Sequence, residues 1–381
     1  MNLPLGKTRI AIVYPHLPQY RTAFFCGLRD VLASENISLD LYYGKPPSDP
    51  KGDERNLDWA APVRNHVLTV MGRELVWQPV PRSVLDADLV ILLQNTLVIS
   101  NFALAARFRA MRKKVAFWGH GVNYQSVAAS FGNKAKKIYT RRADWFFAYT
   151  NSVAAHLMQM GFPQDRITVV QNAIDTRRLV HQFEAVDADR VEKLRRELGL
   201  APGPVGLYCG GMYDLKRLPF LIEAGRRLRQ RIPSFQMVFL GSGTDAARVK
   251  DFAKTASWVR YVGPKFCEER VPYFKLADVL LMPGLVGLAI LDSFALQTPM
   301  VTTRFPHHSP EIDYLEPDRN GLITEDTLDS FVDGTVRLLQ SPDLAATLKH
   351  GCREGAQRYT LQAMVSNFHN GISNALRLSH S

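Results

Sequence analysis

The sequence predicts an α/β protein made of two doubly wound parallel-sheet domains that face one another across a cleft. The chain has 381 residues, a length that suits two domains of about 100–200 residues each. In each half, apolar strand-like runs alternate with helical stretches, which is the rhythm of parallel sheets covered on both faces. A charged stretch without strand periodicity, residues 176–203, separates the two series and ends in Ala-Pro-Gly-Pro.

The first domain is expected over residues 1–175. It opens on the continuous apolar run Arg9–Tyr14, as a strand buried on both faces would. The helical stretch Thr22–Ala33 follows, with apolar residues spaced three and four apart. The next predicted strands are Leu39–Tyr43, Asp88–Leu93, Val115–Trp118, Trp145–Tyr149 and Ile167–Val170, and helices are predicted at 101–113, 131–142 and 152–160.

The second domain, residues 204–345, repeats this alternation. Its predicted strands are Val205–Cys209, Gln236–Leu240, Val259–Val262, Val279–Met282 and Met300–Thr303. Helices are predicted at Leu218–Arg231, Arg248–Thr255, Val271–Lys275 and Gly287–Ala295. We interpret 176–203 as a connection with one polar helix at about 188–198, and 346–381 as closing helices that could cross back to the first domain.

Composition excludes several classes of protein. Hydrophobic residues make up 46% and charged residues 22% of the chain, as in ordinary globular proteins and unlike disordered or fibrous ones. No run of about 18 apolar residues predicts a spanning helix, and the first residues do not read as a signal peptide. Four widely spaced cysteines without a Cys-x-x-Cys indicate reduced thiols, a cytoplasmic location and no zinc site.

Basic charge is concentrated in the first half. Residues 1–175 contain 21 Lys and Arg against 13 Asp and Glu, a net +8 of the chain's +11, which indicates an anionic partner. Lys134, Lys137 and Arg141 share one face of the predicted helix 131–142, beside apolar residues. This face suits a peripheral contact with an anionic membrane, and equally a solvated surface over a packed core. No nucleic-acid recognition module is evident, so we expect no nucleic-acid partner.

Pattern alone leaves several functions open. Two doubly wound domains place a ligand at the carboxyl ends of their strands, between the domains. Dehydrogenases, periplasmic binding proteins, nucleotide-sugar epimerases and nucleotide-sugar glycosyltransferases all fit that description. The segment after the first strand, VYPHLPQYR, contains no glycine, which disfavours a simple Rossmann dehydrogenase.

The most specific segment is residues 279–301, VLLMPGLVGLAILDSFALQTPMV. A strand leads through a Pro-Gly turn into a helix that opens with Gly287-Leu288-Ala289, and the same helix carries Asp292 one turn further in. Free N–H groups at a helix start bind anions, and glycine lets a phosphate approach the backbone. A carboxylate at 292 could accept hydrogen bonds from a ribose diol. The alternative is a plain βαβ unit whose glycines only make a tight turn.

This segment resembles the signature of the retaining nucleotide-sugar glycosyltransferases of family 4, which have the GT-B fold. Five further segments resemble elements of that family and follow in the right order. They are Ala143-Asp144 with Thr150–Ser152, Gln171–Asp175, Tyr208–Lys216, Val262-Gly263, and Pro310–Ile312 with Asn320–Leu322. The resemblance covers essentially the whole chain.

The resemblance implies a nucleotide and donor site in the second domain. Lys216 would bind the diphosphate and Asp292 the ribose, while Glu311 would either contact the donor sugar or cap a turn. The remaining expected donor-site residues are Gly210, Gly211, Arg217, Gly263, Gly287 and Leu288.

The chain departs from the family pattern at two positions. The family's first glutamate, which touches the donor sugar, falls on Gly284, and its arginine, which touches the diphosphate, falls on Gly211. Arg217 or Arg304 is a candidate for the missing cation. The family's second glutamate is shortened to Asp292.

Two further expectations concern the first domain. The family's glycine-rich loop after the first strand is replaced by HLPQYR, which places Tyr20 and Arg21 on the acceptor side. His120 follows the strand Val115–Trp118, where the family has a histidine near the donor sugar. A neutral imidazole there could hydrogen-bond a sugar hydroxyl, although most single histidines have no catalytic role. His120 and Lys216 are therefore the expected catalytic residues, Lys216 as a point charge on a phosphate.

The resemblance implies a retaining glycosyltransferase that moves a sugar from a nucleoside diphosphate sugar to a glycan or lipid-linked acceptor, in the assembly of cell-surface polysaccharide or lipopolysaccharide. No Asp-x-Asp motif lies at a strand end, so we expect no metal, and no cofactor besides the nucleotide sugar. The expected location is cytoplasmic, with peripheral contact at the plasma membrane. A UDP-sugar 2-epimerase on the same fold is one alternative. A non-catalytic nucleotide-sugar or glycan binder is the other, because Gly211 and Gly284 remove two family side chains.

Overall fold

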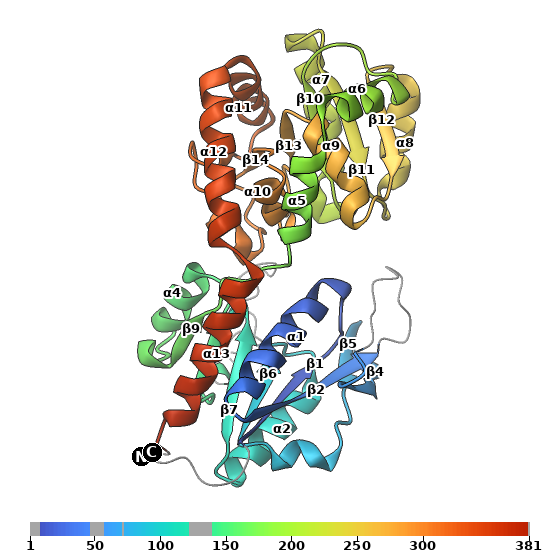
Figure 1. Cartoon of the computed structure of the whole chain (residues 1–381). Helices are drawn as coiled ribbons and strands as arrows, with labels where there is room; N and C mark the ends of the chain where they lie inside the picture. The colour runs from blue at the N-terminus through green and yellow to red at the C-terminus, as the bar shows by residue number, and fades with distance from the viewer. Residues whose placement is uncertain (1–7, 46–56, 71, 122–138, 380–381) are drawn as a thin grey trace. The chain divides into compact units, whose positions relative to one another are not determined.

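The computed structural model describes residues 8–45, 57–70, 72–121 and 139–379. Its contacts divide the chain into two units (Figure 1): the first comprises 1–175 together with 361–381, and the second comprises 176–360. Each unit is built on one parallel β-sheet. The α/β class with two parallel sheets is therefore confirmed.

The first unit contains a seven-stranded sheet with the order β3-β2-β1-β6-β7-β8-β9. Its strands are β1 (Thr8–Tyr14), β2 (Ile37–Lys45), β3 (Ala61–Arg64), β6 (Leu89–Leu93), β7 (Lys114–Gly119), β8 (Trp145–Ala148) and β9 (Ile167–Val169). A separate antiparallel hairpin pairs β4 (His66–Val70) with β5 (Arg73–Trp77). The strand order reverses between β1 and β6, and doubly wound sheets bind ligands at such a switch point.

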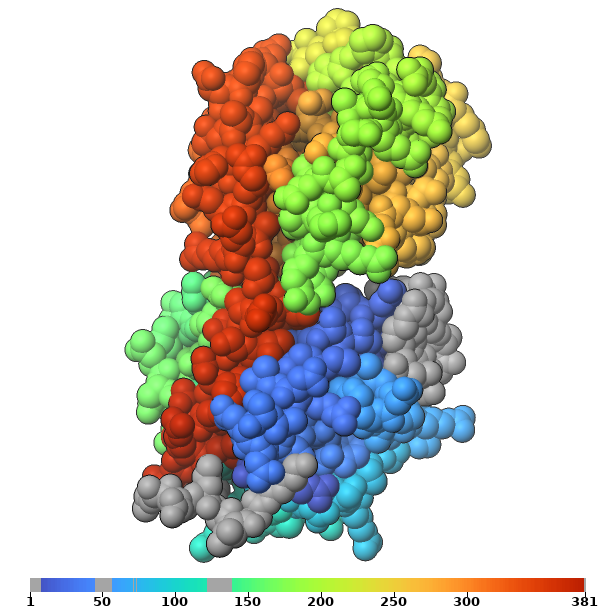
Figure 2. Space-filling model, in the orientation of Figure 1, coloured from blue at the N-terminus to red at the C-terminus, as the bar shows by residue number. Residues whose placement is uncertain are grey.

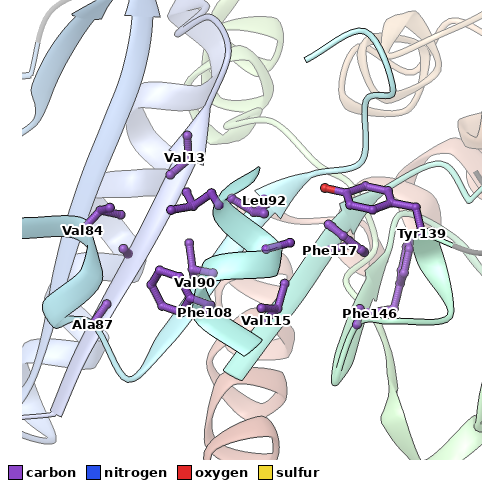
Figure 3. Close-up of a cluster of buried hydrophobic side chains, with 14 of the residues drawn as sticks. Val13, Val84, Ala87, Val90, Leu92, Phe108, Val115, Phe117, Tyr139 and Phe146 are labelled. Carbon is purple, nitrogen blue, oxygen red and sulfur yellow. The ribbon is translucent and has the colours of Figure 1, made fainter. Parts of the chain in front are cut away.

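Helices cover both faces of this sheet. They are α1 (Gln19–Ser34), α2 (Ile99–Ala110), α4 (Asn151–Gln159) and α13 (Leu361–Arg377). Alternate residues of a strand face opposite sides of the sheet. On one side, Val90 of β6 and Phe117 of β7 pack with Phe108 of α2 in one buried cluster, drawn in Figure 3. On the other face, Phe368 of α13 stacks on Phe147 of β8, with ring centroids 4.3 Å apart.

The last helix thus completes the core of the first unit, although it follows the whole second unit in sequence. Helices α1 and α13 pack together, and Figure 2 shows the red surface of α13 against the blue surface of α1. Phe368 also contacts Phe24 of α1 and Trp118 of β7, at 5.0 and 4.9 Å between ring centroids.

The second unit contains a six-stranded parallel sheet with the order β12-β11-β10-β13-β14-β15, which reverses between β10 and β13. The strands are β10 (Val205–Cys209), β11 (Gln236–Leu240), β12 (Val259–Gly263), β13 (Val279–Leu281), β14 (Met300–Thr303) and β15 (Gly321–Thr324). The helices are α5 (Arg177–Ala185), α6 (Ala188–Glu197), α7 (Leu218–Arg231), α8 (Ala246–Thr255), α9 (Val271–Leu276), α10 (Ala289–Ala295), α11 (Leu328–Gln340) and α12 (Pro342–Arg358).

Some elements differ from the prediction. Strands β3, β4, β5 and β15 were not predicted. The stretch 176–203, expected to hold one polar helix, forms both α5 and α6, which pack against α9 within the second unit. Most of the helix predicted at 131–142 lies outside the described residues. Among the described helices, none is long and apolar enough to cross a membrane.

Candidate functional site

Two loops of the second unit meet where its strand order reverses. One loop, 210–217, joins β10 to α7, and the other, 282–288, joins β13 to α10. The amide of Leu285 donates to the carbonyl of Leu215 at 2.9 Å, and the ammonium of Lys216 donates to the carbonyl of Leu285. These hydrogen bonds join the loops at the carboxyl ends of β10 and β13, where doubly wound sheets bind ligands.

Lys216 is a buried cation in this loop pair. The residue is only 7% exposed, and burial lowers the pKa of its ammonium to about 8. Over the described residues, no carboxylate lies within ion-pair distance of it. A buried charge without a counter-charge is costly, so the position suits an anionic ligand.

Gly284 lies against the backbone that carries Lys216. A Cβ added at Gly284 would lie 2.9 Å from the carbonyl carbon of Lys216, 3.0 Å from its Cα, and closer still to the carbonyl oxygen of Leu215. No larger residue fits there unless this backbone moves. The backbone of residues 215–216 therefore occupies the space that a side chain would need at the position where the family resemblance expects a glutamate.

The second departure, Gly211, has a different environment. A Cβ added there would meet the ring of Tyr213 at 2.9 Å, and no other group approaches within 4 Å. Tyr213 is 38% exposed and has room to turn away. Gly284 is thus required by close backbone packing, whereas Gly211 is not.

Asp292 on α10 forms an ion pair that the sequence did not predict. Arg270, which ends a short 3₁₀ helix at Cys267–Arg270, donates from Nη2 to Oδ1 of Asp292 at 2.8 Å. Burial raises the pKa of Asp292, and the positive charge of Arg270 opposes that rise. Arg270, Asp292 and Lys216 all act electrostatically on the thiol of Cys209 at the end of β10, so the fold gathers these charges at one strand end.

The two candidates for the missing cation are both ion-paired. Arg217, at a left-handed backbone position with φ of 57°, pairs with Asp326 and donates to the carbonyl of Pro283 at 3.3 Å. Arg304 is exposed and pairs with Glu325 at 2.9 Å. Arg217 therefore contacts the loop after β13, while Arg304 lies in a surface pair. The additional cation in the cluster is Arg270, whose partner Asp292 lies 22 residues away in the chain.

His308 supports the loop after β13. Its Nδ1 accepts from the amide of Val286 at 3.3 Å, and its Nε2 donates to the carbonyl of Thr303 at 2.8 Å. Burial lowers the pKa of His308, which favours the neutral ring that this pattern requires. The neighbouring hydroxyl of Ser309 is buried and has no hydrogen-bond partner in the described part of the chain. The only signal in the sequence was the pair of histidines after the predicted strand 300–303.

The remaining predicted donor-site residues lie at the carboxyl ends of strands in the second unit or beside α10. Gly210 follows β10, and Gly263 ends β12 with φ of 87°. Gly287 has φ of 59° and precedes Leu288, the N-cap of α10. Glu311 is buried in a 3₁₀ helix, Pro310–Tyr314, that packs on α10. Within the described ranges, no group of three or more His, Cys, Asp or Glu side chains could hold a metal ion.

The carboxyl end of the first sheet carries aromatic side chains. His120 follows β7 and is exposed, and its ring packs edge-on against Tyr149 with centroids 4.5 Å apart. Tyr20 is 42% exposed at the start of α1. Both positions are open to a ligand.

Arg21, the other residue expected on the acceptor side, is 2% exposed. Its guanidinium donates to the side chain of Asn172 and to the carbonyl of Ala173, and it lies 5.2 Å from the ring centroid of Trp118. Burial therefore gives Arg21 a supporting role for the backbone at 172–173, and Tyr20 is the exposed member of the pair.

Two family models match successive parts of the chain. The model described as Glycosyltransferase Family 4 matches residues 25–178, and the model described as Glycosyl transferases group 1 matches residues 203–341. Together they include the strands β2 to β15 and the loops 210–217 and 282–288, but not β1.

Curated relatives are similar over part of their length. A D-inositol 3-phosphate glycosyltransferase of Saccharomonospora viridis is 29% identical over 44% of this chain and 42% of its own. The putative colanic acid biosynthesis glycosyltransferase WcaL of Escherichia coli is 24% identical over 57% of this chain and 53% of its own. The chain thus spans about half the length of these relatives. The putative glycosyltransferase EpsD of Bacillus subtilis is 25% identical over 68% of this chain and 69% of its own.

Solved structures share the fold over nearly the whole chain at low identity. A glycosyltransferase of Rickettsia africae has a TM-score of 0.71 and 13% identity, covering 98% of this chain and 100% of that one. Anabaena Alr3699/HepE in complex with UDP has a TM-score of 0.69 and 14% identity, covering 96% and 100%. WaaG, a glycosyltransferase involved in lipopolysaccharide biosynthesis, has a TM-score of 0.62 and 12% identity, covering 95% and 98%.

Proposed function

Because the chain belongs to the family-4 type of glycosyltransferases and has the GT-B fold, we propose that it transfers a glycosyl group from a nucleoside diphosphate sugar to a glycan or lipid-linked acceptor. We propose that the second unit binds the nucleotide sugar, that the first binds the acceptor, and that the anomeric configuration is retained. The setting would be the assembly of surface polysaccharide or lipopolysaccharide. The relative named for colanic acid biosynthesis and the fold of WaaG support this setting.

The observation that carries the proposal is the buried ammonium of Lys216. When the bond between the anomeric carbon and the diphosphate breaks, its electron pair leaves with the diphosphate and negative charge grows on the phosphate oxygen. Stabilising such charge with positioned cations and N–H donors is usually the largest catalytic effect. Lys216 is held in place by the carbonyl of Leu285, and the amides of residues 287–289 open α10 from the same loop.

The other predicted residues have roles consistent with their positions. Oδ1 of Asp292 accepts a hydrogen bond from Arg270, and Oδ2 would accept hydrogen bonds from the ribose hydroxyls. The exposed ring of His120 would hydrogen-bond a sugar hydroxyl, and the exposed Tyr20 would contact the acceptor. Because Lys216 and backbone amides would supply the positive charge for the leaving group, we propose that no metal is required.

A panel of nucleotide sugars tests this function, with and without a metal chelator. Hydrolysis or transfer that persists in chelator supports a metal-independent transferase, and the anomeric configuration of the product decides retention. Isomerised sugar would favour the 2-epimerase alternative. Binding without turnover, measured by calorimetry, would favour the non-catalytic binder.

We also propose peripheral contact with an anionic membrane, motivated by the net +8 over residues 1–175. Lys134 and Lys137 of the predicted basic face lie outside the described residues, and Arg141 is exposed. Each basic residue near an anionic bilayer contributes about 1 kcal/mol, and the attraction fades within a Debye length of about 8–10 Å. We expect salt-sensitive sedimentation with acidic vesicles, reduced when all three residues become Glu. Wild-type protein that stays in the supernatant at low salt would contradict the proposal.

A further inference from the structure

A small basic pocket lies at the amino ends of neighbouring strands in the first unit. Its volume is about 180 Å³. The charged residues that line it are Arg109 in the last turn of α2, Lys114 at the start of β7, Arg141, Asp144 before β8, and Arg166 before β9. His120 follows the carboxyl end of β7. The pocket therefore lies at the opposite end of the strands from His120.

The pocket is lined by four cations and one carboxylate, an excess of positive charge. Oδ2 of Asp144 accepts from the amide of Val115 at 2.8 Å. Across the described ranges, no carboxylate lies within ion-pair distance of the guanidinium groups of Arg109, Arg141 or Arg166. Asp144 and Asp88 act electrostatically on Lys114, so the protein offsets only part of the positive charge that faces this space.

Backbone carbonyls hold two of these cations in place. Arg109 donates to the carbonyl of Arg142, and the ammonium of Lys114 donates to the carbonyl of Leu376 at the end of α13. Lys114 is 8% exposed, and burial lowers its pKa. Neutral carbonyls fix the positions of the cations without cancelling their charge, so their mutual repulsion persists until an anion enters.

The size and shape of the pocket limit what that anion can be. Pockets for drug-sized ligands have volumes of about 300–1,000 Å³, so a cavity of 180 Å³ is too small for a nucleotide sugar. A single tetrahedral phosphoryl group is smaller. Its oxygens suit the planar, forked donors of arginine, while lysine acts as a point charge.

We propose that this pocket binds a phosphate group, as a phosphate mono- or diester, at a site separate from the donor diphosphate. The group belongs either to a soluble phosphorylated compound or to a lipid headgroup. This inference goes beyond the proposed transfer reaction and does not depend on it, because the pocket lies in the unit that is not assigned to the nucleotide.

The experiment uses the full chain and two matched double variants. Arg141→Gln/Arg166→Gln removes two pocket cations that are at least partly exposed. The control, Arg64→Gln/Arg107→Gln, removes two exposed arginines of the same unit that do not line the pocket. Both variants lose the same charge, so non-specific electrostatic attraction changes equally.

One arm titrates inorganic phosphate and glycerol phosphate by calorimetry, and the other measures co-sedimentation with phosphatidylcholine vesicles with and without phosphatidic acid. A charge-assisted hydrogen bond corresponds to about a tenfold change in affinity or more. We expect the pocket variant to lose at least that factor, and the control to stay within about twofold of wild type because its arginines lie outside the pocket.

The two arms distinguish the source of the phosphate. A loss confined to the soluble phosphates identifies a soluble ligand, and a pocket-dependent loss of vesicle binding identifies a lipid headgroup. Equal affinity of wild type and the pocket variant in both arms, or no binding by wild type in either arm, would overturn the proposal.

Discussion

The carboxyl ends of the two sheets differ in how they hold charge. In the second unit, the loop after β10 carries the buried Lys216 and Arg217, which pairs with Asp326 after β15. Arg270 in the short helix after β12 pairs with Asp292 of α10. In the first unit, the same end carries the buried Arg21 among aromatic rings. Carboxylates pair with Arg217 and Arg270 in the second unit. The partners of Arg21 are instead an amide side chain, a backbone carbonyl and aromatic rings.

The first unit also carries basic charge at the amino ends of its strands. Residues 1–175 have a net charge of +8, and four of their described cations line the pocket at the amino ends of β7, β8 and β9. Charge at the second sheet suits the donor diphosphate, while charge at the first sheet suits a separate anion. Substitutions in the second unit can show how far its charged loops depend on their fixed geometry.

The largest effect is expected from Gly284→Ala. The new Cβ would collide with the backbone of residues 215–216, and overpacking of this kind costs about 3 kcal/mol. We expect a lower melting temperature together with loss of turnover, because the loop that carries Lys216 must move. Gly27→Ala in α1 is the matched control. Its Cβ would lie 3.4 Å from Val365, and alanine in a helix is favoured over glycine by about 0.5–1 kcal/mol. Equal melting temperatures for the two variants would contradict the close packing at Gly284.

Lys216→Ala should lower turnover by about a hundredfold, as the loss of one transition-state electrostatic contact commonly does. The variant should still fold, because it removes a buried charge that has no carboxylate partner among the described residues. Lys250→Ala, an exposed lysine of the same unit, is the control and should retain wild-type turnover. Near-normal turnover of Lys216→Ala would mean that Arg217, Arg270 or the backbone stabilises the diphosphate.

Asp292→Asn should weaken binding of the free nucleoside diphosphate, since a charge-assisted hydrogen bond contributes about 1.5–3 kcal/mol. The same change leaves Arg270 without its partner, so calorimetry should include the double variant Arg270→Gln/Asp292→Asn. If Asp292 contacts the ribose, the double variant remains weak. Recovery of affinity in the double variant would show that Asp292 acts only by pairing with Arg270, and unchanged affinity of a folded Asp292→Asn would remove it from the site.

The smallest effect is a pH dependence set by Lys216. Its pKa in the folded protein is about 8, below the ordinary lysine value of 10.5, and a bound diphosphate would raise it again. Binding above pH 8 therefore requires uptake of a proton, and affinity should fall by up to about tenfold per pH unit.

The stability of the free protein should change with pH in the opposite direction. Between pH 8 and 10.5 the unfolded chain keeps the Lys216 proton that the folded protein has lost, so the free energy of unfolding rises with pH. Lys216→Met should remove both trends, as measured by calorimetry and by denaturant titration. A wild-type affinity that stays constant from pH 7 to 9.5 would contradict the assignment of Lys216 to the diphosphate.

Much of the fold could be predicted because its strands are continuous apolar runs, the pattern of strands buried on both faces. The missed strands lack that pattern. Strand β3 contains Pro62 and lies at the edge of its sheet, where a proline is tolerated. Strand β4 is exposed along its whole length, and β15 begins with the glycine of an Asn-Gly pair that resembled a loop.

The candidate site was only partly predictable for a related reason. Lys216 and Asp292 each follow a predicted strand, in a segment that resembles the family pattern. The local sequence was therefore enough to identify them. Arg270 and His308 each bond to a residue 22 positions away, and nothing in their local sequence indicates those partners. The crowding at Gly284 depends on a carbonyl from another loop, so sequence showed a missing glutamate but not the backbone that occupies its place.

The return of α13 to the first unit has a consequence for folding during synthesis. The second unit, 176–360, is continuous in sequence and can fold as soon as it leaves the ribosome, whereas the first unit emerges earlier but lacks Phe368 until the chain is nearly finished. Until then, Phe24, Trp118 and Phe147 lack the ring that packs against them. The order of emergence and the order of completion are thus reversed, and a ribosome that stalls after residue 360 releases a finished second unit attached to an unfinished first one.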